Sequence, residues 1–155
     1  MPKPRKPSRS RKPAAVRQRP TAAQRRAVEN RAGGVCEYCH CLKRFVPEPF
    51  NVEHVIPVVR GGKTEIGNLA WACAGCNYHK HDKVEAVDPQ TDLIVALFNP
   101  RRHRWEEHFA WNEDAKLMIG LTATGRATIH VLWLNREELI NLRWALSVLN
   151  LHPPA

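Results

Sequence analysis

Two Cys-x-x-Cys pairs constrain the fold of this chain more than any other feature of its sequence. Cys36 and Cys39 form the first pair, and Cys73 and Cys76 form the second. Each pair can direct two thiolates at one ion, so the two pairs together can complete a tetrahedral zinc site. Such a site is closed to water. The spacing therefore predicts a structural zinc ion that joins two distant segments and stabilises a small fold.

Other uses of these cysteines require features that the sequence lacks. The string from Cys36 to His40 matches a c-type haem attachment motif, but that use requires export, and no apolar secretory signal is evident. A thioredoxin-like redox role needs a βαβ pattern around the first pair. Five cysteines are an odd count for a disulfide framework, which a reducing cytosol also disfavours. Cys41 is left over, with no expected role or that of a spare ligand.

Positive charge is concentrated at the N-terminus. The formal net charge is +9, and residues 1–31 hold eleven of the 24 lysines and arginines with Glu29 as the one acid. Residues 1–20 alternate proline with positive charge and offer no hydrophobic period, so we predict a disordered basic tail that contacts a polyanion. No apolar run approaches the roughly 20 residues of a membrane span. We therefore expect a soluble, cytoplasmic protein without a membrane partner.

Residues 21–150 are predicted to form a single domain. Thr21 has the character of an N-cap, and the glycine pair after residue 32 supplies a helix stop. The expected parts are a helix over residues 21–32, a zinc-containing core over residues 33–86 and a C-terminal extension over residues 87–150.

The extension is predicted to contain strands and a closing helix. Residues 93–98 and 118–134 are rich in β-branched side chains and favour β segments. Asn135 and Glu138 resemble a capping box, and leucines then repeat at helical spacing. The aromatic residues are expected in the core rather than at a stacking surface, namely Trp105, Phe109 and Trp111. Together these patterns indicate an α+β fold.

A longer motif surrounds the second cysteine pair. It combines an acid–histidine step, a proline, a glycine pair, an Asn-Leu step and a Cys-x-x-Cys pair that continues into a helix. The positions are Glu53, His54, Pro57, Gly61, Gly62, Asn68, Leu69, Cys73, Cys76, Asn77 and Lys80. This segment, about a third of the chain, resembles the HNH endonuclease family. Residues 97–111 and 120–129 also look like the C-terminal part of a bacterial subgroup of small HNH proteins.

The resemblance implies a ββα-metal core, in which a hairpin and a helix surround a catalytic divalent ion. It makes His54 the general base, and Glu53 and Asn77 metal ligands. Asn77 stands where the family has its last histidine and Glu53 where an aspartate is usual, and oxygen ligands suit Mg²⁺ or Mn²⁺. His81 follows Asn77 by four residues, so a continuing helix would present it as a third ligand or phosphate contact. Asn68 is expected to hold the hairpin loop through backbone hydrogen bonds and so keep His54 in register.

The resemblance also implies the reaction, which is metal-dependent hydrolysis of DNA phosphodiester bonds with water activated by His54. Arg60, Lys63 and Lys80 are candidate contacts to duplex DNA, and low sequence specificity is expected because no base-reading helix is evident. A catalytically inactive, zinc-stabilised nucleic-acid-binding module is the alternative. A third interpretation is an RNA-directed nuclease or a processing factor for modified DNA. The sequence leaves the oligomeric state open.

Removal of residues 1–20 is expected to flatten the salt dependence of DNA binding without stopping cleavage. Each phosphate that the tail neutralises contributes about −0.9 to the slope of log K against log salt on duplex DNA. Binding titrations at several salt concentrations measure this slope for the full chain and for the truncated chain. An unchanged slope would show that the tail takes no part in binding.

Overall fold

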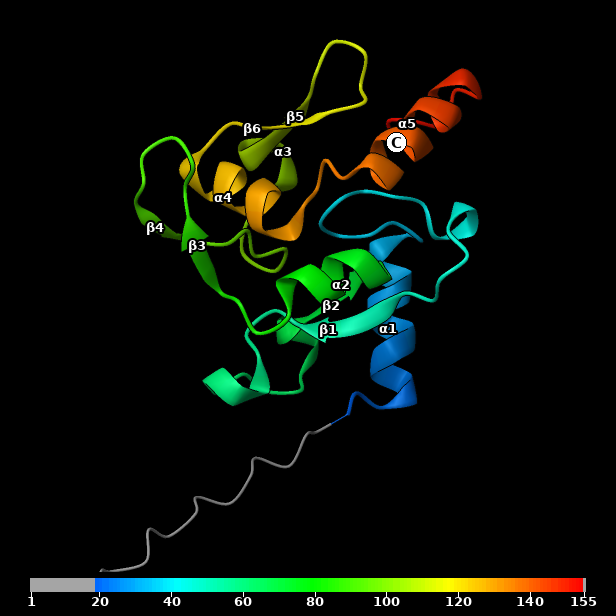
Figure 1. The fold of residues 1–155 in the computed structure, drawn as a ribbon. Helices are drawn as coiled ribbons and strands as arrows, with labels where there is room; N and C mark the ends of the chain where they lie inside the picture. The colour runs from blue at the N-terminus through cyan, green and yellow to red at the C-terminus, as the bar shows by residue number, and fades with distance from the viewer. Residues whose placement is uncertain (1–18, 155) are drawn as a thin grey trace, which may run out of the picture.

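The computed structural model describes residues 19–154, so all but the last two residues of the predicted basic tail lie outside the described part of the chain. Five helices and three pairs of antiparallel strands make up the described fold, together with three short 3₁₀ turns (Figure 1). The predicted α+β class is confirmed. None of the helices among residues 19–154 has the length and apolarity needed to cross a bilayer.

The N-terminal helix α1 (Ala22–Ala32) begins and ends where its caps predict. The Thr21 hydroxyl accepts a hydrogen bond from the Gln24 amide, and the side-chain oxygen of Gln24 accepts one from the Thr21 amide, which forms a capping box. Gly33 ends the helix in the left-handed conformation, with φ of 61°. The helix then anchors the neighbouring hairpin, because Arg31 donates to the carbonyl oxygen of Leu69 over 2.6 Å.

A hairpin followed by a helix forms the centre of the fold. Strand β1 (Asn51–His54) pairs antiparallel with β2 (Leu69–Ala72), and the register sets Glu53 opposite Ala70. The connecting loop contains the 3₁₀ turns Val58–Arg60 and Ile66–Asn68. Helix α2 (Ala74–Lys80) follows β2 directly and lies against the hairpin (Figure 1). This is the predicted ββα arrangement.

The extension adds two more strand pairs. Strand β3 (Glu85–Val87) pairs with β4 (Ile94–Ala96), and β5 (Phe109–Trp111) pairs with β6 (Met118–Gly120). The short helix α3 (Trp105–His108) precedes β5, and a 3₁₀ turn spans Lys43–Phe45 in the first knuckle region. The aromatic residues expected in the core are there: Phe109 is buried, and Trp105 and Trp111 pack against the core.

The prediction of β structure over residues 118–134 is wrong beyond Gly120, because helix α4 (Ala123–Leu132) follows β6. Thr122 caps this helix by accepting a hydrogen bond from the Gly125 amide over 3.0 Å. A Cβ atom at Gly125 would lie 2.1 Å from the carbonyl oxygen of His108, so the glycine permits a close backbone approach. Capping and packing thus override the β propensity of the side chains.

The closing helix is present as α5 (Glu137–Val148), but its predicted capping box is not. Its N-cap is Arg136, which makes no side-chain cap hydrogen bond. The Asn135 side chain instead accepts from the Met118 amide and donates to the Met118 carbonyl oxygen, each over 2.8 Å. These two bonds fix the start of α5 to β6. Of the leucines at helical spacing, Leu139 and Leu146 are buried, whereas Leu149 lies beyond the helix and is exposed.

Candidate metal centre and active site

All five cysteines are buried free thiols. The sulfur atoms of four of them lie within 4.8 Å of one another, namely Cys36, Cys39, Cys41 and Cys73. Cys76, which the spacing predicts as a ligand, is fully buried next to this group, and its amide donates to the Cys73 sulfur over 3.4 Å. Cys41, predicted to have no role or that of a spare ligand, therefore lies inside the cluster.

The geometry of the thiol cluster fits a zinc ion. Two zinc–sulfur bonds of about 2.3 Å at the tetrahedral angle place the sulfurs about 3.8 Å apart. The sulfurs of Cys39 and Cys73, one from each pair, are 3.7 Å apart. An all-thiol donor set is also one that zinc prefers. The cluster is thus compatible with a structural zinc site that joins the two Cys-x-x-Cys segments.

Arg136 covers the outer side of the second cysteine pair. Its guanidinium donates to the sulfur of Cys73 over 3.5 Å and approaches the sulfur of Cys76 at 4.0 Å. Gly75, between these cysteines, leaves room for it, since a Cβ atom there would lie 2.5 Å from the guanidinium. A cation at this position offsets the negative charge of the thiolates. No motif in the sequence singled out this residue.

Glu53, the predicted carboxylate ligand, is held from two sides in the protein interior. The Tyr38 hydroxyl donates to Oε1, and the Lys80 ammonium donates to Oε2 over 2.9 Å. Burial, and then the charge of Glu53, raises the pKa of Tyr38 well above its usual value, so its hydroxyl stays a donor. Tyr38 lies inside the first cysteine pair and Lys80 ends α2. The carboxylate is therefore positioned by one residue from the first cysteine pair and one from the helix that follows the second.

The predicted DNA contact through Lys80 does not fit this placement. Its side chain is 2 % exposed, and its ammonium also donates to the carbonyl oxygen of His54 over 3.1 Å. A buried, paired ammonium cannot reach a phosphate in solution. Arg60 and Lys63, the other two candidates, are exposed on the hairpin loop.

His54 follows Glu53 on β1 and is partly buried. Its Nε2 lies 2.8 Å from the hydroxyl oxygen of Thr64 across the loop. Burial lowers the pKa of His54, the nearby Glu53 acts to raise it and Lys80 lowers it further, with a net downward shift. The imidazole is therefore neutral at neutral pH, the form in which it can accept a proton. No sequence motif singles out Thr64, which lies ten residues from His54 along the chain.

Asn68 makes the backbone hydrogen bonds expected of it. Its Oδ1 accepts from the Ile56 amide over 2.8 Å, and its Nδ2 donates to the carbonyl oxygens of Ile56 and Lys63, each over 2.9 Å. The side chain is buried, and these hydrogen bonds all go to the backbone of the loop. Asn68 thus fixes the loop that carries Thr64.

A cavity of about 690 Å³ brings the predicted site residues together. Glu53, His54, Asn77 and His81 all line it, from β1, α2 and the residue that follows α2. The prediction placed His81 on the same helix face as Asn77, which requires α2 to continue through residue 81. The helix instead ends at Lys80. His81 has φ of 48°, and its Nδ1 lies 3.0 Å from the Asp82 carboxylate. Its side chain is exposed at the rim of the cavity.

The comparisons with known proteins agree with this geometry. Residues 36–83 match the family described as HNH endonuclease. This span contains the five cysteines, the β1–β2 hairpin and α2. No curated protein matches the chain.

Replacement of single cysteines is expected to identify the fourth zinc ligand. The candidate ligand sets are Cys36, Cys39 and Cys73 with either Cys76 or Cys41. Cys73→Ala should lose the metal and the cooperative unfolding transition, because Cys73 belongs to both sets. A structural zinc contributes roughly 10 kcal/mol or more to small metal-dependent folds. Cys41→Ala should keep one zinc per chain and unfold close to the full protein. Native mass spectrometry and thermal unfolding measure these properties. Zinc loss from Cys41→Ala with zinc retained in Cys76→Ala would place Cys41, and not Cys76, in the site.

Proposed function

Since residues 36–83 carry an HNH endonuclease domain, we propose that the protein is a metal-dependent nuclease that hydrolyses phosphodiester bonds of DNA. One observation supports this function above the others: an imidazole, a carboxylate and an amide, on His54, Glu53 and Asn77, line one solvent-accessible cavity. These are the groups that water activation and binding of a hard cation require.

His54 is the general base of the proposed reaction. Its Nε2 is engaged by Thr64, which leaves Nδ1 to accept a proton from water. The water oxygen then forms a bond to phosphorus, and the bond from phosphorus to the 3′ oxygen breaks. The leaving 3′ oxygen takes up a proton from solvent, and the products are a 5′-phosphate and a 3′-hydroxyl end. Thr64 and Asn68 act as positioning residues, because the first holds the ring and the second holds the loop that carries Thr64.

The donors around the cavity fit a divalent ion. A carboxylate has about four acceptor positions, so the bonds from Tyr38 and Lys80 leave Glu53 with capacity for a further ligand interaction. Asn77 and His81 line the same cavity and would complete the protein ligands. Oxygen donors favour Mg²⁺ or Mn²⁺, which when bound supplies the positive charge that stabilises the phosphorane and the leaving oxygen.

Basic residues line the cavity and are exposed on the hairpin loop, an arrangement that suits duplex DNA. Arg19 and Arg25 line it from the N-terminal side, and Arg60 and Lys63 are exposed on the hairpin loop. These side chains would contact phosphates, which carry no sequence information. We propose low sequence specificity for this reason.

One observation favours the non-catalytic alternative. The Lys80 ammonium already compensates the charge of Glu53 inside the protein, which weakens the attraction of that carboxylate for a cation. A zinc-stabilised DNA-binding module without activity would have the same fold and the same basic rim. Only a cleavage assay separates the two functions.

The protein is expected to nick supercoiled plasmid in the presence of Mg²⁺ or Mn²⁺, and His54→Ala is expected to lower the rate by about 100-fold or more, because the general base is lost. Gel separation of nicked from supercoiled plasmid measures the rate, with chelator as the metal-free reference. His103→Ala, a half-buried histidine outside the cavity, is the matched control and should nick normally. Equal nicking by His54→Ala with intact zinc content would exclude His54 as the base.

Thr64→Val is expected to lower kcat by about 10- to 100-fold while KM for DNA changes little, because the ring of His54 loses the partner that orients it. Thr64→Ser keeps the hydroxyl and should restore most of the rate. Steady-state nicking over a range of plasmid concentrations separates the two parameters. A Thr64→Val protein with normal kcat would show that this hydrogen bond does not position the base.

A further inference from the structure

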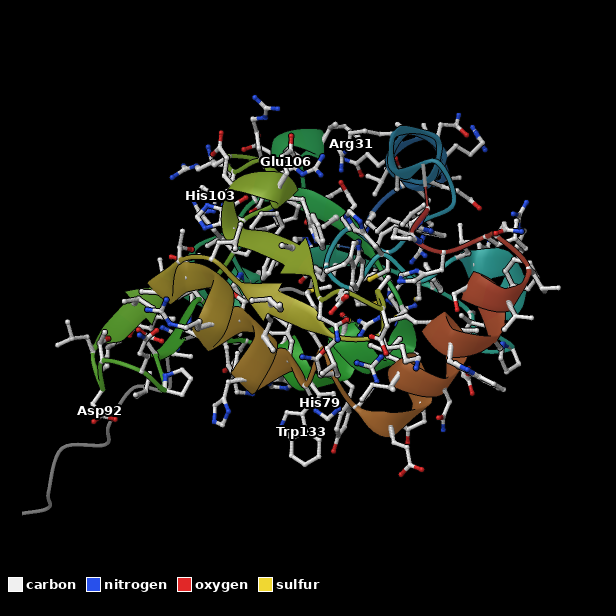
Figure 2. The ribbon with its side chains drawn as sticks, turned by 90° about the horizontal axis from the view of Figure 1, so that it is seen from above. Arg31, His79, Asp92, His103, Glu106 and Trp133 are labelled. Carbon is white, nitrogen blue, oxygen red and sulfur yellow. The ribbon has the colours of Figure 1, made fainter. Side chains whose placement is uncertain are left out.

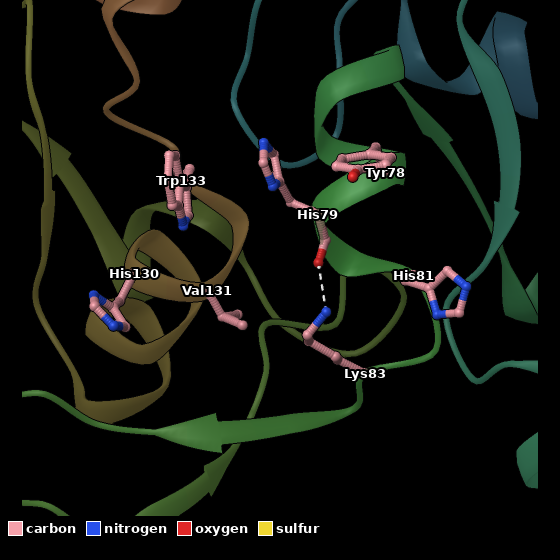
Figure 3. Close-up of a pocket in the computed structure, with 7 residues that line it drawn as sticks. All are labelled: Tyr78, His79, His81, Lys83, His130, Val131 and Trp133. Carbon is pink, nitrogen blue, oxygen red and sulfur yellow. Dashed lines mark hydrogen bonds between the residues drawn. The ribbon is translucent and has the colours of Figure 1, made fainter.

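A second cavity lies beside the proposed active site. It has a volume of about 500 Å³, and the residues that line it come from α2, α4 and the residues just beyond each helix: Tyr78, His79, His81, Lys83, His130, Val131 and Trp133 (Figure 3). His81 lines both this cavity and the one that contains His54. The two cavities are therefore neighbours on one surface.

The lining is aromatic and exposed. Tyr78 is 77 % exposed and Trp133 is 62 % exposed, which is unusual for such large side chains. The rings of His79 and Trp133 stack with centroids 5.4 Å apart and an interplanar angle of 11°. Figure 2 shows these two side chains next to each other at the edge of the molecule, and Figure 3 shows His79 between Trp133 and Tyr78. These flat faces form a stacking surface, which we define as Tyr78, His79 and Trp133.

The backbone holds Trp133 in a conformation that favours glycine. Its φ is 51° and its ψ is 50°, and it ends α4 in the left-handed region. The carbonyl oxygen of Trp133 accepts a hydrogen bond from Arg136, which also donates to the sulfur of Cys73. The backbone of Trp133 is thus tied through Arg136 to the thiol cluster, in a conformation that carries an energetic cost.

The charge around the stacking surface suits an anionic strand. Lys83 and His130 line the same cavity, and none of its described lining residues is acidic. The ammonium of Lys83 donates to the His79 carbonyl oxygen over 3.0 Å, which places a positive charge at the end of α2 nearest the surface (Figure 3). Exposed rings next to positive charge are the combination that proteins use to bind unpaired bases and their phosphates.

We propose that the stacking surface binds unpaired bases of single-stranded DNA that continues from the cleavage site, so that the preferred substrate carries a single-stranded stretch beside the cut. This inference rests on the proposed nuclease function, because it assigns a substrate class to the same site. His81 lines both cavities, so the stacking surface lies next to the proposed active site.

The test compares binding of a labelled 12-nucleotide thymidine strand, an abasic strand of equal length and charge, and the matched duplex. His54→Ala is the background, so that no strand is cut. Trp133→Gly removes the ring and suits the left-handed backbone, so this variant is expected to fold. Tyr78→Ala removes the second exposed ring from a helix position that accepts alanine. Trp144→Ala, which removes an exposed indole on α5, is the matched control.

Fluorescence anisotropy is expected to show tighter binding of the thymidine strand than of the abasic strand. Each of Trp133→Gly and Tyr78→Ala should weaken thymidine binding about 5- to 100-fold, in line with the loss of one base stack, while Trp144→Ala leaves it unchanged. Tyr78→Phe keeps the ring and should bind normally. Equal affinity for the thymidine and abasic strands, or unchanged binding by Trp133→Gly, would overturn the proposal and leave the surface to a protein partner.

A plasmid-nicking assay on Trp133→Gly with His54 intact distinguishes this inference from the proposed function. If Trp133→Gly nicks plasmid and binds the thymidine strand as tightly as the unsubstituted protein, the proposed stacking surface is overturned and the proposed nuclease function stands. Base-dependent binding in a protein that never nicks would support the stacking surface and remove the nuclease.

Discussion

The convergence of buried thiols from two distant segments determines where every other group of the site lies. The first segment carries Tyr38 between its two cysteines, and the second starts α2 with a cysteine at its N-cap. Residues of both segments also contact Glu53, which accepts one hydrogen bond from Tyr38 and one from Lys80. The contacts that bring the sulfurs together thus also place the Glu53 carboxylate.

The ion pair between Glu53 and Lys80 shows the cost of placing a charged site inside a small domain. An isolated buried carboxylate would be strongly disfavoured, and a partner ammonium with further hydrogen bonds makes its burial tolerable. The same partner competes with a metal ion for the carboxylate. The arrangement therefore favours a stable resting site over tight binding of a cation.

Spacing along the chain predicted those parts of the fold that depend on local chemistry. The cysteine pairs and the caps of α1 follow from residues close together in the sequence, whereas the hairpin and α2 were expected from the resemblance to the HNH family. The extension was harder because long-range contacts decide its structure: residues 123–132 have β-branched side chains but a capped helix start and a glycine against His108. Asn135 was predicted to form a capping box, but its side-chain oxygen and nitrogen both hydrogen-bond to the backbone of Met118. Lys80 matched a motif position, yet only the packed structure shows that it points inward.

Arg19 and Pro20 border the cavity that contains His54, and this places the start of the described chain at the mouth of the proposed active site. A polypeptide joined directly to Arg19, in a chain without residues 1–18, would begin beside an incoming phosphate backbone. An affinity tag or fusion partner at that position would compete with the nucleic acid for space. The opposite terminus follows α5, away from the hairpin (Figure 1), and offers the safer attachment point for immobilisation or labelling.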